Sequence, residues 1–190
     1  MTVQELQQFE SEIAALFEAG KIRAPIHLSG GNESQLIEIF KDIPPDAWVC
    51  SNHRSHYHAL LKGIPPEWLK QEIIEGRSIT LCNREHRFIT SAIVGGILPI
   101  AVGLAMAGEG VCCFIGDMAA ETGIFHECVK YSEGHNLPIT FIVEDNGVGV
   151  DTPTVQIWGR WSPLLTKSVL TYQYEREYPH QGTNKGWVTF

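Results

Sequence analysis

The chain has 190 residues, which is long enough for one domain with a sizeable buried core. Its hydrophobic content of 44% argues against a disordered chain, and its formal net charge of −8, without any run of Lys or Arg, argues against a nucleic-acid-binding surface. The polar N-terminus shows no signal peptide, and five cysteines without a CxxC pair predict a reduced, cytoplasmic protein rather than a disulfide framework.

An amphipathic helix is predicted at the N-terminus. Thr2 and Glu5 have the spacing of a capping box, and apolar residues follow at helical intervals until Gly20, where the helix should end. We therefore expect residues 1–24 to hold a docking helix that carries no chemistry of its own.

Short elements come next in the chain. Breaker residues and apolar spacing predict helices at 33–41, 67–74 and 93–107, and a strand at 48–51. The uncharged stretch 88–108 is long enough to span a bilayer, but its glycines, alanines and proline favour a buried helix in an α/β core. We therefore expect neither a membrane nor a nucleic acid among the partners.

Two buried apolar runs, at 111–115 and 138–143, predict parallel strands joined by one crossover helix. Asp117 closely follows the first strand, and Asn146 follows the second strand 29 residues later. Because the carboxyl ends of parallel strands meet at one edge of a sheet, we expect these two side chains to lie together.

Oxygen ligands at two strand ends suit a hard divalent cation. Mg²⁺ takes an octahedron of oxygens, and Asp117 and Asn146 offer a carboxylate and an amide oxygen, with the Val148 carbonyl as a third ligand. The backbone after Asp117 opens a helix whose free N–H groups can receive a phosphate, and the small Ala119 allows close approach. Each strand end alone is also a common turn sequence, but together they predict a metal and diphosphate site.

Four segments in the same order resemble one protein family. His27–Glu33 is similar to the family's H-L-x-x-G-x-E, and His53–His56 is similar to Y-R-x-H. Ile93–Pro99 is similar to I-V-G-x-x-x-P, and Gly116–Met118 and Asp145–Asn146 are similar to GDG and NN. On these motifs residues 25–154 resemble the alpha subunit of the thiamine-diphosphate-dependent first component of 2-oxo-acid dehydrogenase complexes, of the pyruvate and branched-chain type, in the transketolase-like superfamily. The resemblance implies an α/β fold, doubly wound, with a mostly parallel sheet and helices on both faces. It implies one such domain over residues 1–190, with 25–154 as the cofactor-binding core.

The resemblance also implies a role for each matching position. The metal, Mg²⁺ or Ca²⁺, would be held by Asp117, Asn146 and Val148. Thiamine diphosphate would be bound by His53, Arg54, Ala92, Val94, Gly116, Met118 and Ala119. His56 would be the catalytic residue, close to the reacting thiazolium, where it transfers protons or orients the substrate.

The chain departs from the family pattern at several motif positions. Met118 replaces the last glycine of GDG, Asp145 replaces the first Asn of NN, and His53 replaces the Tyr of the second motif. Family alpha subunits are also longer, and residues 155–190 form a C-terminal tail of unclear role in which 169–174 is a candidate strand.

The resemblance implies a partner chain. In the superfamily the cofactor lies between two similar domains, and this chain matches only the diphosphate half. We expect a beta-type subunit that carries the pyrimidine-binding half and an activating Glu, in a heterotetramer or a homodimer-based assembly. The implied function is that of the alpha-type subunit of a decarboxylating 2-oxo-acid dehydrogenase or a transketolase-like enzyme, whose substrates the sequence does not name.

Alternative interpretations remain open. Met118 and the missing downstream region also fit a cofactor-fold subunit that has lost turnover and acts as a structural partner. The strand ends alone would also suit an unrelated Mg²⁺- or nucleotide-binding α/β protein. A zinc cluster could also be suggested by Cys50, His53, His56 and His58, but their spacing matches no firm zinc signature.

Overall fold

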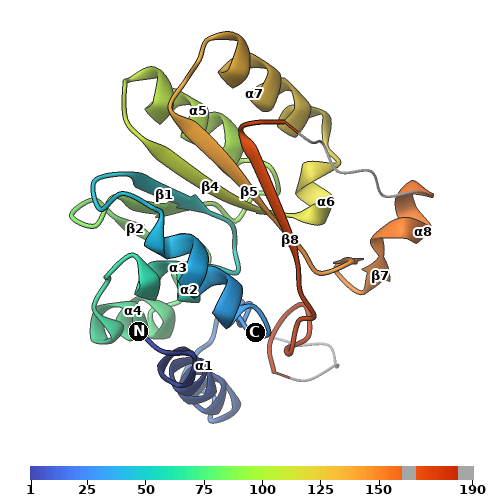
Figure 1. Cartoon of the computed structure of the whole chain (residues 1–190). Helices are drawn as coiled ribbons and strands as arrows, with labels where there is room; N and C mark the ends of the chain where they lie inside the picture. The colour runs from blue at the N-terminus through green and yellow to red at the C-terminus, as the bar shows by residue number, and fades with distance from the viewer. Residues whose placement is uncertain (160–165, 184–190) are drawn as a thin grey trace.

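A mostly parallel sheet forms the centre of the computed structural model, which describes residues 1–159 and 166–183 (Figure 1). Within those residues the sheet has six strands in the order β2-β3-β1-β4-β5-β8, and β2 alone runs antiparallel to its neighbour. The strands are β1 Trp48–Ser51, β2 Cys82–Asn83, β3 Phe88–Thr90, β4 Val111–Gly116, β5 Ile139–Asp145 and β8 Val169–Gln173. A separate antiparallel ribbon pairs β6 Val148–Gly149 with β7 Thr152–Pro153.

Helices cover both faces of the sheet (Figure 1). One face carries α1 Val3–Glu18, α2 Glu33–Lys41, α3 His56–Leu61 and α4 Pro66–Ile74, and the other carries α5 Ile97–Met106 and α7 Gly123–Gly134. Two short helices, α6 Asp117–Ala120 and α8 Thr154–Trp158, lie beyond the carboxyl ends of the strands. The predicted doubly wound α/β fold is therefore confirmed.

The central strands β4 and β5 are largely apolar because helices cover both faces of the sheet there. In β4, Phe114 packs into the core under α1–α4, whereas Cys113 and Ile115 pack into the core under α5 and α7. In β5, Ile142 packs into the core under α1–α4 and Phe141 into the core under α5 and α7. Since successive side chains of a strand point to opposite faces, a strand covered on both sides needs an unbroken apolar run.

The N-terminal helix is part of the core. Its predicted capping box is present, with the Thr2 N–H donating to Glu5 Oε2 (2.7 Å) and the Glu5 N–H to Thr2 Oγ1 (3.3 Å). Leu6 and Ile13 are completely buried in the core cluster that α1 shares with α2, α3 and α4. The helix predicted at 93–107 is shorter in the structure, where α5 begins at Ile97. Among the described residues no helix is long and apolar enough to cross a membrane.

The crossover between β4 and β5 differs from the prediction of one helix. It contains α6 and α7, because Thr122 adopts an extended conformation and its hydroxyl donates to the Ala119 carbonyl (2.6 Å), which closes the first helix. This break keeps α6 at the end of β4 while α7 returns along the sheet.

The C-terminal segment joins the sheet. The predicted strand at 169–174 is confirmed as β8, which pairs parallel with β5, and the chain after it crosses the loop before α2. A Cβ on Gly31 would lie 1.9 Å from the Glu175 carbonyl oxygen, and Gly31 has φ +91°. Glycine is therefore required where the C-terminal segment crosses that loop. Residues 160–165 and 184–190 of the predicted tail lie outside the described residues.

Candidate functional site

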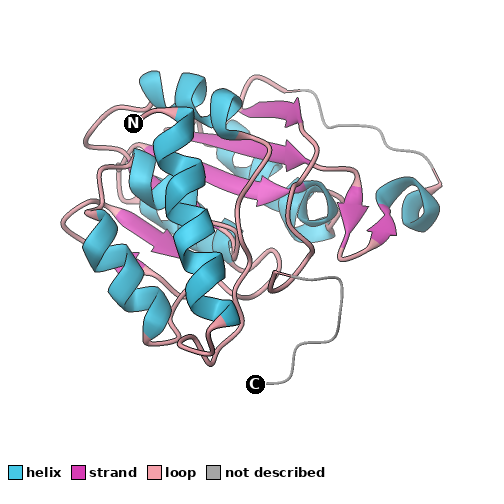
Figure 2. Cartoon of the chain, turned by 90° about the horizontal axis from the view of Figure 1, so that it is seen from below, coloured by secondary structure: helices cyan, strands magenta, loops and turns pink. Residues whose placement is uncertain are grey.

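A cavity of about 430 Å³ opens at the carboxyl ends of β1, β4 and β5. In Figure 2 the arrows of the parallel strands point toward the end of the molecule that carries the two-stranded ribbon and α8. This is the place where open parallel sheets usually bind ligands. The predicted site residues that line the cavity are His53, Arg54, Val94, Gly116, Asp117, Met118, Ala119, Asn146 and Val148. Ala92 and His56 are not part of the lining.

Asp117 supplies a buried carboxylate to the cavity. It is the first residue of α6, directly after β4, and its side chain is 2% exposed. The Thr154 hydroxyl donates to Asp117 Oδ2 (2.5 Å) and orients it. Burial raises the pKa of Asp117, and the nearby Asp145 adds to the rise. A bound cation would offset this cost of keeping the carboxylate charged, so the residue fits a metal ligand.

Asn146 is held with a defined amide orientation. Its Nδ2 donates to the Tyr174 hydroxyl (3.2 Å), and its Oδ1 accepts the N–H of Val148 (3.1 Å). Val148 lies opposite Pro153 in the β6–β7 ribbon, and proline has no N–H to donate to the Val148 carbonyl. An amide oxygen and a backbone carbonyl oxygen, both of the kind that Mg²⁺ prefers, are therefore present at the sheet edge that holds Asp117.

Asp145, which stands where the resembled family has Asn, is directed to other partners. Its Oδ2 accepts from Gln173 Nε2 (2.9 Å), and its Oδ1 accepts the Gly147 N–H (2.9 Å). The carboxylate thus ties the end of β5 to β8 and shapes the turn that presents Asn146.

Arg54 carries an unpaired donor at the cavity wall. Its Nη2 donates to the His180 carbonyl (3.4 Å), whereas its Nη1 is buried and has no hydrogen-bond partner among the described residues. Burial lowers the pKa of Arg54, because removal from water disfavours the charged form. A buried guanidinium with a free N–H is a natural partner for a phosphate oxygen, so the residue fits an anionic ligand.

Met118 is accommodated by a glycine. A Cβ on Gly149 would lie 2.5 Å from Met118 Cγ, so the absence of a side chain at Gly149 makes room for the methionine. The larger residue in the GDG-like motif therefore lies against β6, and both residues remain in the cavity lining.

His56 is not brought to the cavity. It is completely buried between Glu10 and Ser78, with Nδ1 3.0 Å from the carboxylate and Nε2 2.8 Å from the hydroxyl. Because a carboxylate only accepts, Nδ1 donates to Glu10, and Nε2 is hydrogen-bonded to the Ser78 hydroxyl. The chain turns into α3 directly after Arg54, which directs His56 into the interior. The expectation of His56 beside the reacting group is therefore not met, and its contacts favour a structural role.

The zinc alternative finds no support in the geometry. His58 lies in the interior, where Nδ1 meets the Ser51 hydroxyl (2.7 Å) and Nε2 meets Glu144 Oε1 (3.1 Å). Among the described residues Cys50, His53, His56 and His58 do not come together as a ligand group.

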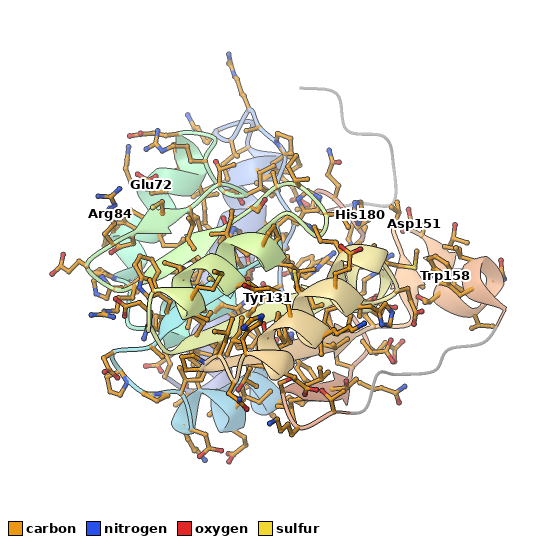
Figure 3. All side chains as sticks on the ribbon, turned by 90° about the horizontal axis from the view of Figure 1, so that it is seen from above. Glu72, Arg84, Tyr131, Asp151, Trp158 and His180 are labelled. Carbon is orange, nitrogen blue, oxygen red and sulfur yellow. The ribbon has the colours of Figure 1, made fainter. Side chains whose placement is uncertain are left out.

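Several polar and charged lining residues were missed by the sequence prediction. Glu144 is buried at the end of β5 and accepts from the Tyr172 hydroxyl (2.6 Å), and burial and this carboxylate raise the pKa of Tyr172. In Figure 3 His180 lies toward the same end of the molecule as Asp151 and Trp158. The missed residues include Glu144, Tyr174, Arg176 and His180. The predicted strand at 169–174 was a usable signal for Tyr174, because residues that follow a parallel strand lie at its carboxyl edge.

The chain has relatives among known proteins. The family model described as "Dehydrogenase E1 component" matches residues 1–158. The chain is 29% identical to the alpha subunit of acetoin:2,6-dichlorophenolindophenol oxidoreductase of Bacillus subtilis (strain 168), over 78% of this chain and 50% of the relative. It is also 29% identical to the alpha subunit of the pyruvate dehydrogenase E1 component of Porphyra purpurea, over 74% of this chain and 47% of that one.

The matches are partial in length. The chain spans about half of the curated relatives that it matches, for example 46% of the pyruvate dehydrogenase E1 alpha subunit of Zymomonas mobilis subsp. mobilis, to which it is 28% identical. A solved structure from Mycobacterium smegmatis, described as a thiamin diphosphate-dependent enzyme, overlaps 65% of this chain and 22% of its own, with 21% identity and a TM-score of 0.42.

Proposed function

The chain belongs to the dehydrogenase E1 component family, and from this premise we propose that it is the alpha-type, diphosphate- and metal-binding subunit of a thiamine-diphosphate-dependent 2-oxo-acid dehydrogenase or of a related transketolase-like enzyme. The single observation that supports this most is the meeting of Asp117, Asn146 and Arg54 at one cavity. An oxygen-ligand pair and a free guanidinium donor are what a metal diphosphate requires. Membership of this family argues against an unrelated nucleotide-binding protein.

The residues of the cavity divide between metal and cofactor. Mg²⁺ or Ca²⁺ would be held by Asp117, Asn146 and the Val148 carbonyl. The diphosphate would be held by Arg54 and by the backbone of Gly116, Met118 and Ala119, with His53 and Val94 nearer the rest of the cofactor. A contact from Ala92, which lies outside the lining, stays a prediction. When bound, thiamine diphosphate supplies the electron sink that a 2-oxo acid needs in order to lose carbon dioxide.

The residues around the ligands fix their orientation. Thr154 holds the Asp117 carboxylate, and Tyr174 holds the amide nitrogen of Asn146. Ile93 and Val94 contribute apolar side chains to the cavity. Preorganised ligands lower the cost of binding because little freedom is lost when the ion arrives.

A beta-type partner completes the proposal. Ile93 and Val94, at the cavity, are 72% and 66% exposed, which is unusual for neighbouring apolar side chains. A partner that covers them would also enclose the cofactor, in a heterotetramer or a homodimer-based assembly. The cysteine usage is the basis on which a cytoplasmic location is proposed.

The proposed site is tested by titrating the purified chain with thiamine diphosphate in the presence and absence of Mg²⁺, with and without the beta-type chain. Asp117→Ala should abolish the Mg²⁺-dependent binding, and Asp46→Ala, which removes an exposed carboxylate, should leave it unchanged. Both variants should keep the circular dichroism spectrum of the wild type. Tight, Mg²⁺-dependent binding by Asp117→Ala would refute the site.

A non-catalytic subunit is the second candidate, and the burial of His56 favours it, since the one predicted catalytic side chain is out of reach of the cavity. The two candidates differ in turnover. Decarboxylation of 2-oxo acids by the mixed alpha and beta chains supports the catalytic subunit. Binding of thiamine diphosphate without turnover on 2-oxo acids or sugar phosphates supports the structural one.

A further inference from the structure

Three histidine side chains from distant parts of the sequence meet at one side of the cavity. His27 precedes α2, His53 follows β1, and His180 lies in the segment after β8. One ring nitrogen from each lies within 4.8 Å of the other two. The ring centroids are 4.4 Å apart for His27 and His53, 5.0 Å for His27 and His180, and 5.7 Å for His53 and His180.

The histidine at the centre of this group has an unused nitrogen. His27 is 8% exposed, and its Nδ1 is buried with no hydrogen-bond partner among the described residues. Native structures rarely leave such an atom unpaired, so it points to a ligand that accepts its lone pair. Burial lowers the pKa of His27 to about 2 and of His53 to about 4, so both rings are neutral at pH 7, as metal ligands must be.

We propose that His27, His53 and His180 form a three-histidine site for a transition-metal ion such as Zn²⁺, separate from the oxygen-ligand site at Asp117 and Asn146. Imidazole nitrogens prefer Zn²⁺ to Mg²⁺, so the two sites select different ions. A tetrahedral ion with Zn–N bonds of about 2.0–2.1 Å separates its ligand nitrogens by about 3.3 Å, so small side-chain rotations must close the group. The fourth position faces the cavity, which His53 and His180 line, and takes a water molecule.

The ion would fasten the C-terminal segment to the cavity wall. That segment is already attached there, through the Gly182 N–H to the Ile26 carbonyl (3.0 Å) and Arg54 Nη2 to the His180 carbonyl. Arg54 and Arg176 oppose a cation at this place, whereas Glu144 and Asp151 favour it. We therefore expect a micromolar affinity, weaker than that of a structural zinc site.

The experiment is calorimetric titration of the chelator-treated full chain with Zn²⁺ in excess Mg²⁺. Cys82→Ser is used as the background because Cys82 is an exposed thiol. We expect one Zn²⁺ per chain. His180→Ala should weaken binding by more than about 100-fold, since loss of even an outer-shell partner typically costs 10–100-fold. The matched control His126→Ala removes an exposed histidine of α7 and should bind as the background does.

Two further measurements keep the result decisive. Co²⁺ in place of Zn²⁺ should give the absorption of four nitrogen and oxygen ligands without a thiolate charge-transfer band. Asp117→Ala should lose Mg²⁺-dependent cofactor binding but retain the Zn²⁺ site, so this inference and the proposed function can fail separately. Absence of micromolar Zn²⁺ binding, equal binding by a folded His180→Ala variant, or a thiolate band would each overturn the site. Should His180→Ala unfold, His53→Gln replaces it with the same expected loss.

Discussion

At the scale of single residues, the site is defined by polar groups that the fold leaves unpaired. Arg54 Nη1 and His27 Nδ1 are buried without partners among the described residues, and the Asp117 carboxylate is buried with one hydroxyl donor from a side chain. By contrast, His56 and Glu10 satisfy each other in the interior. Ser29, Asn32, Ser55 and Ser132 also carry buried unpaired atoms, so at Arg54 and His27 it is the position beside the cavity, together with the missing partner, that points to a ligand.

The unpaired donor of Arg54 leads to a first prediction. Arg54→Ala should weaken diphosphate binding by about 1.5–3 kcal/mol, the usual contribution of a hydrogen bond to a charged group. Isothermal titration with thiamine diphosphate and Mg²⁺ measures this change. Arg84→Ala is the control, because Arg84 is exposed and lies at the opposite end of the molecule from His180 (Figure 3). An unchanged dissociation constant for Arg54→Ala would remove Arg54 from the diphosphate site.

The buried His27 should make the free energy of unfolding depend on pH. Burial, reinforced by the neighbours His53, Arg54 and His180, holds its pKa at about 2 in the folded chain, whereas an unfolded histidine has a pKa of about 6.5. Between these values only the unfolded chain takes up the proton. The contribution of neutral His27 to the free energy of unfolding is therefore fully present above about pH 6.5. It falls with decreasing pH, by up to about 1.4 kcal/mol per pH unit for one proton.

The corresponding measurement is urea unfolding at pH 7.5, 6 and 5. His27→Gln should flatten the loss of unfolding free energy below pH 6.5, and the exposed His126→Gln should retain the wild-type slope. Equal slopes for the two variants would show that His27 is protonated in the folded chain.

At the scale of elements, the C-terminal segment depends on one glycine. Gly31 has positive φ and faces the Glu175 carbonyl, so Gly31→Ala combines backbone strain with a direct clash. We expect a loss of roughly 2–4 kcal/mol in the free energy of unfolding, at the upper end of single substitutions.

Gly103 offers a matched control for this prediction. It lies in α5, and a Cβ there would meet nothing within 4 Å. Gly103→Ala should stabilise the chain by about 0.5–1 kcal/mol, because alanine favours the helix. Urea unfolding compares the two variants, and a Gly31→Ala protein as stable as the wild type would mean that the segment can detach without cost.

At the scale of the whole molecule, the exposed apolar residues beside the cavity predict a protein interface. The double substitution Ile93→Asp and Val94→Asp should weaken association with the beta-type chain by at least about tenfold, since it places charges in an apolar contact. Met106→Asp is the control, because Met106 is 59% exposed at the far end of α5. Sedimentation of mixed chains measures the change, and unaltered assembly of the double variant would place the interface elsewhere.

The sequence by itself determined which residues follow the central parallel strands at one edge of the sheet. Asp117 and Asn146 each follow an apolar run, and the rule that parallel strands end at one edge requires only this local pattern. The capping box of α1 and the strand β8 were likewise predicted from local patterns, whereas the doubly wound fold class was implied by the family resemblance. The local features arise from residues that are neighbours in the sequence, so their pattern is visible without the fold.

Only the tertiary structure decided which polar side chains face the cavity. His56 stands two residues after Arg54, yet its burial depends on Glu10 and Ser78, which are distant in the sequence. Tyr174 and His180 reach the cavity because β8 pairs with β5 and the chain then crosses Gly31. Contacts of this kind depend on packing between segments that are far apart in the chain, so no local sequence pattern predicts them.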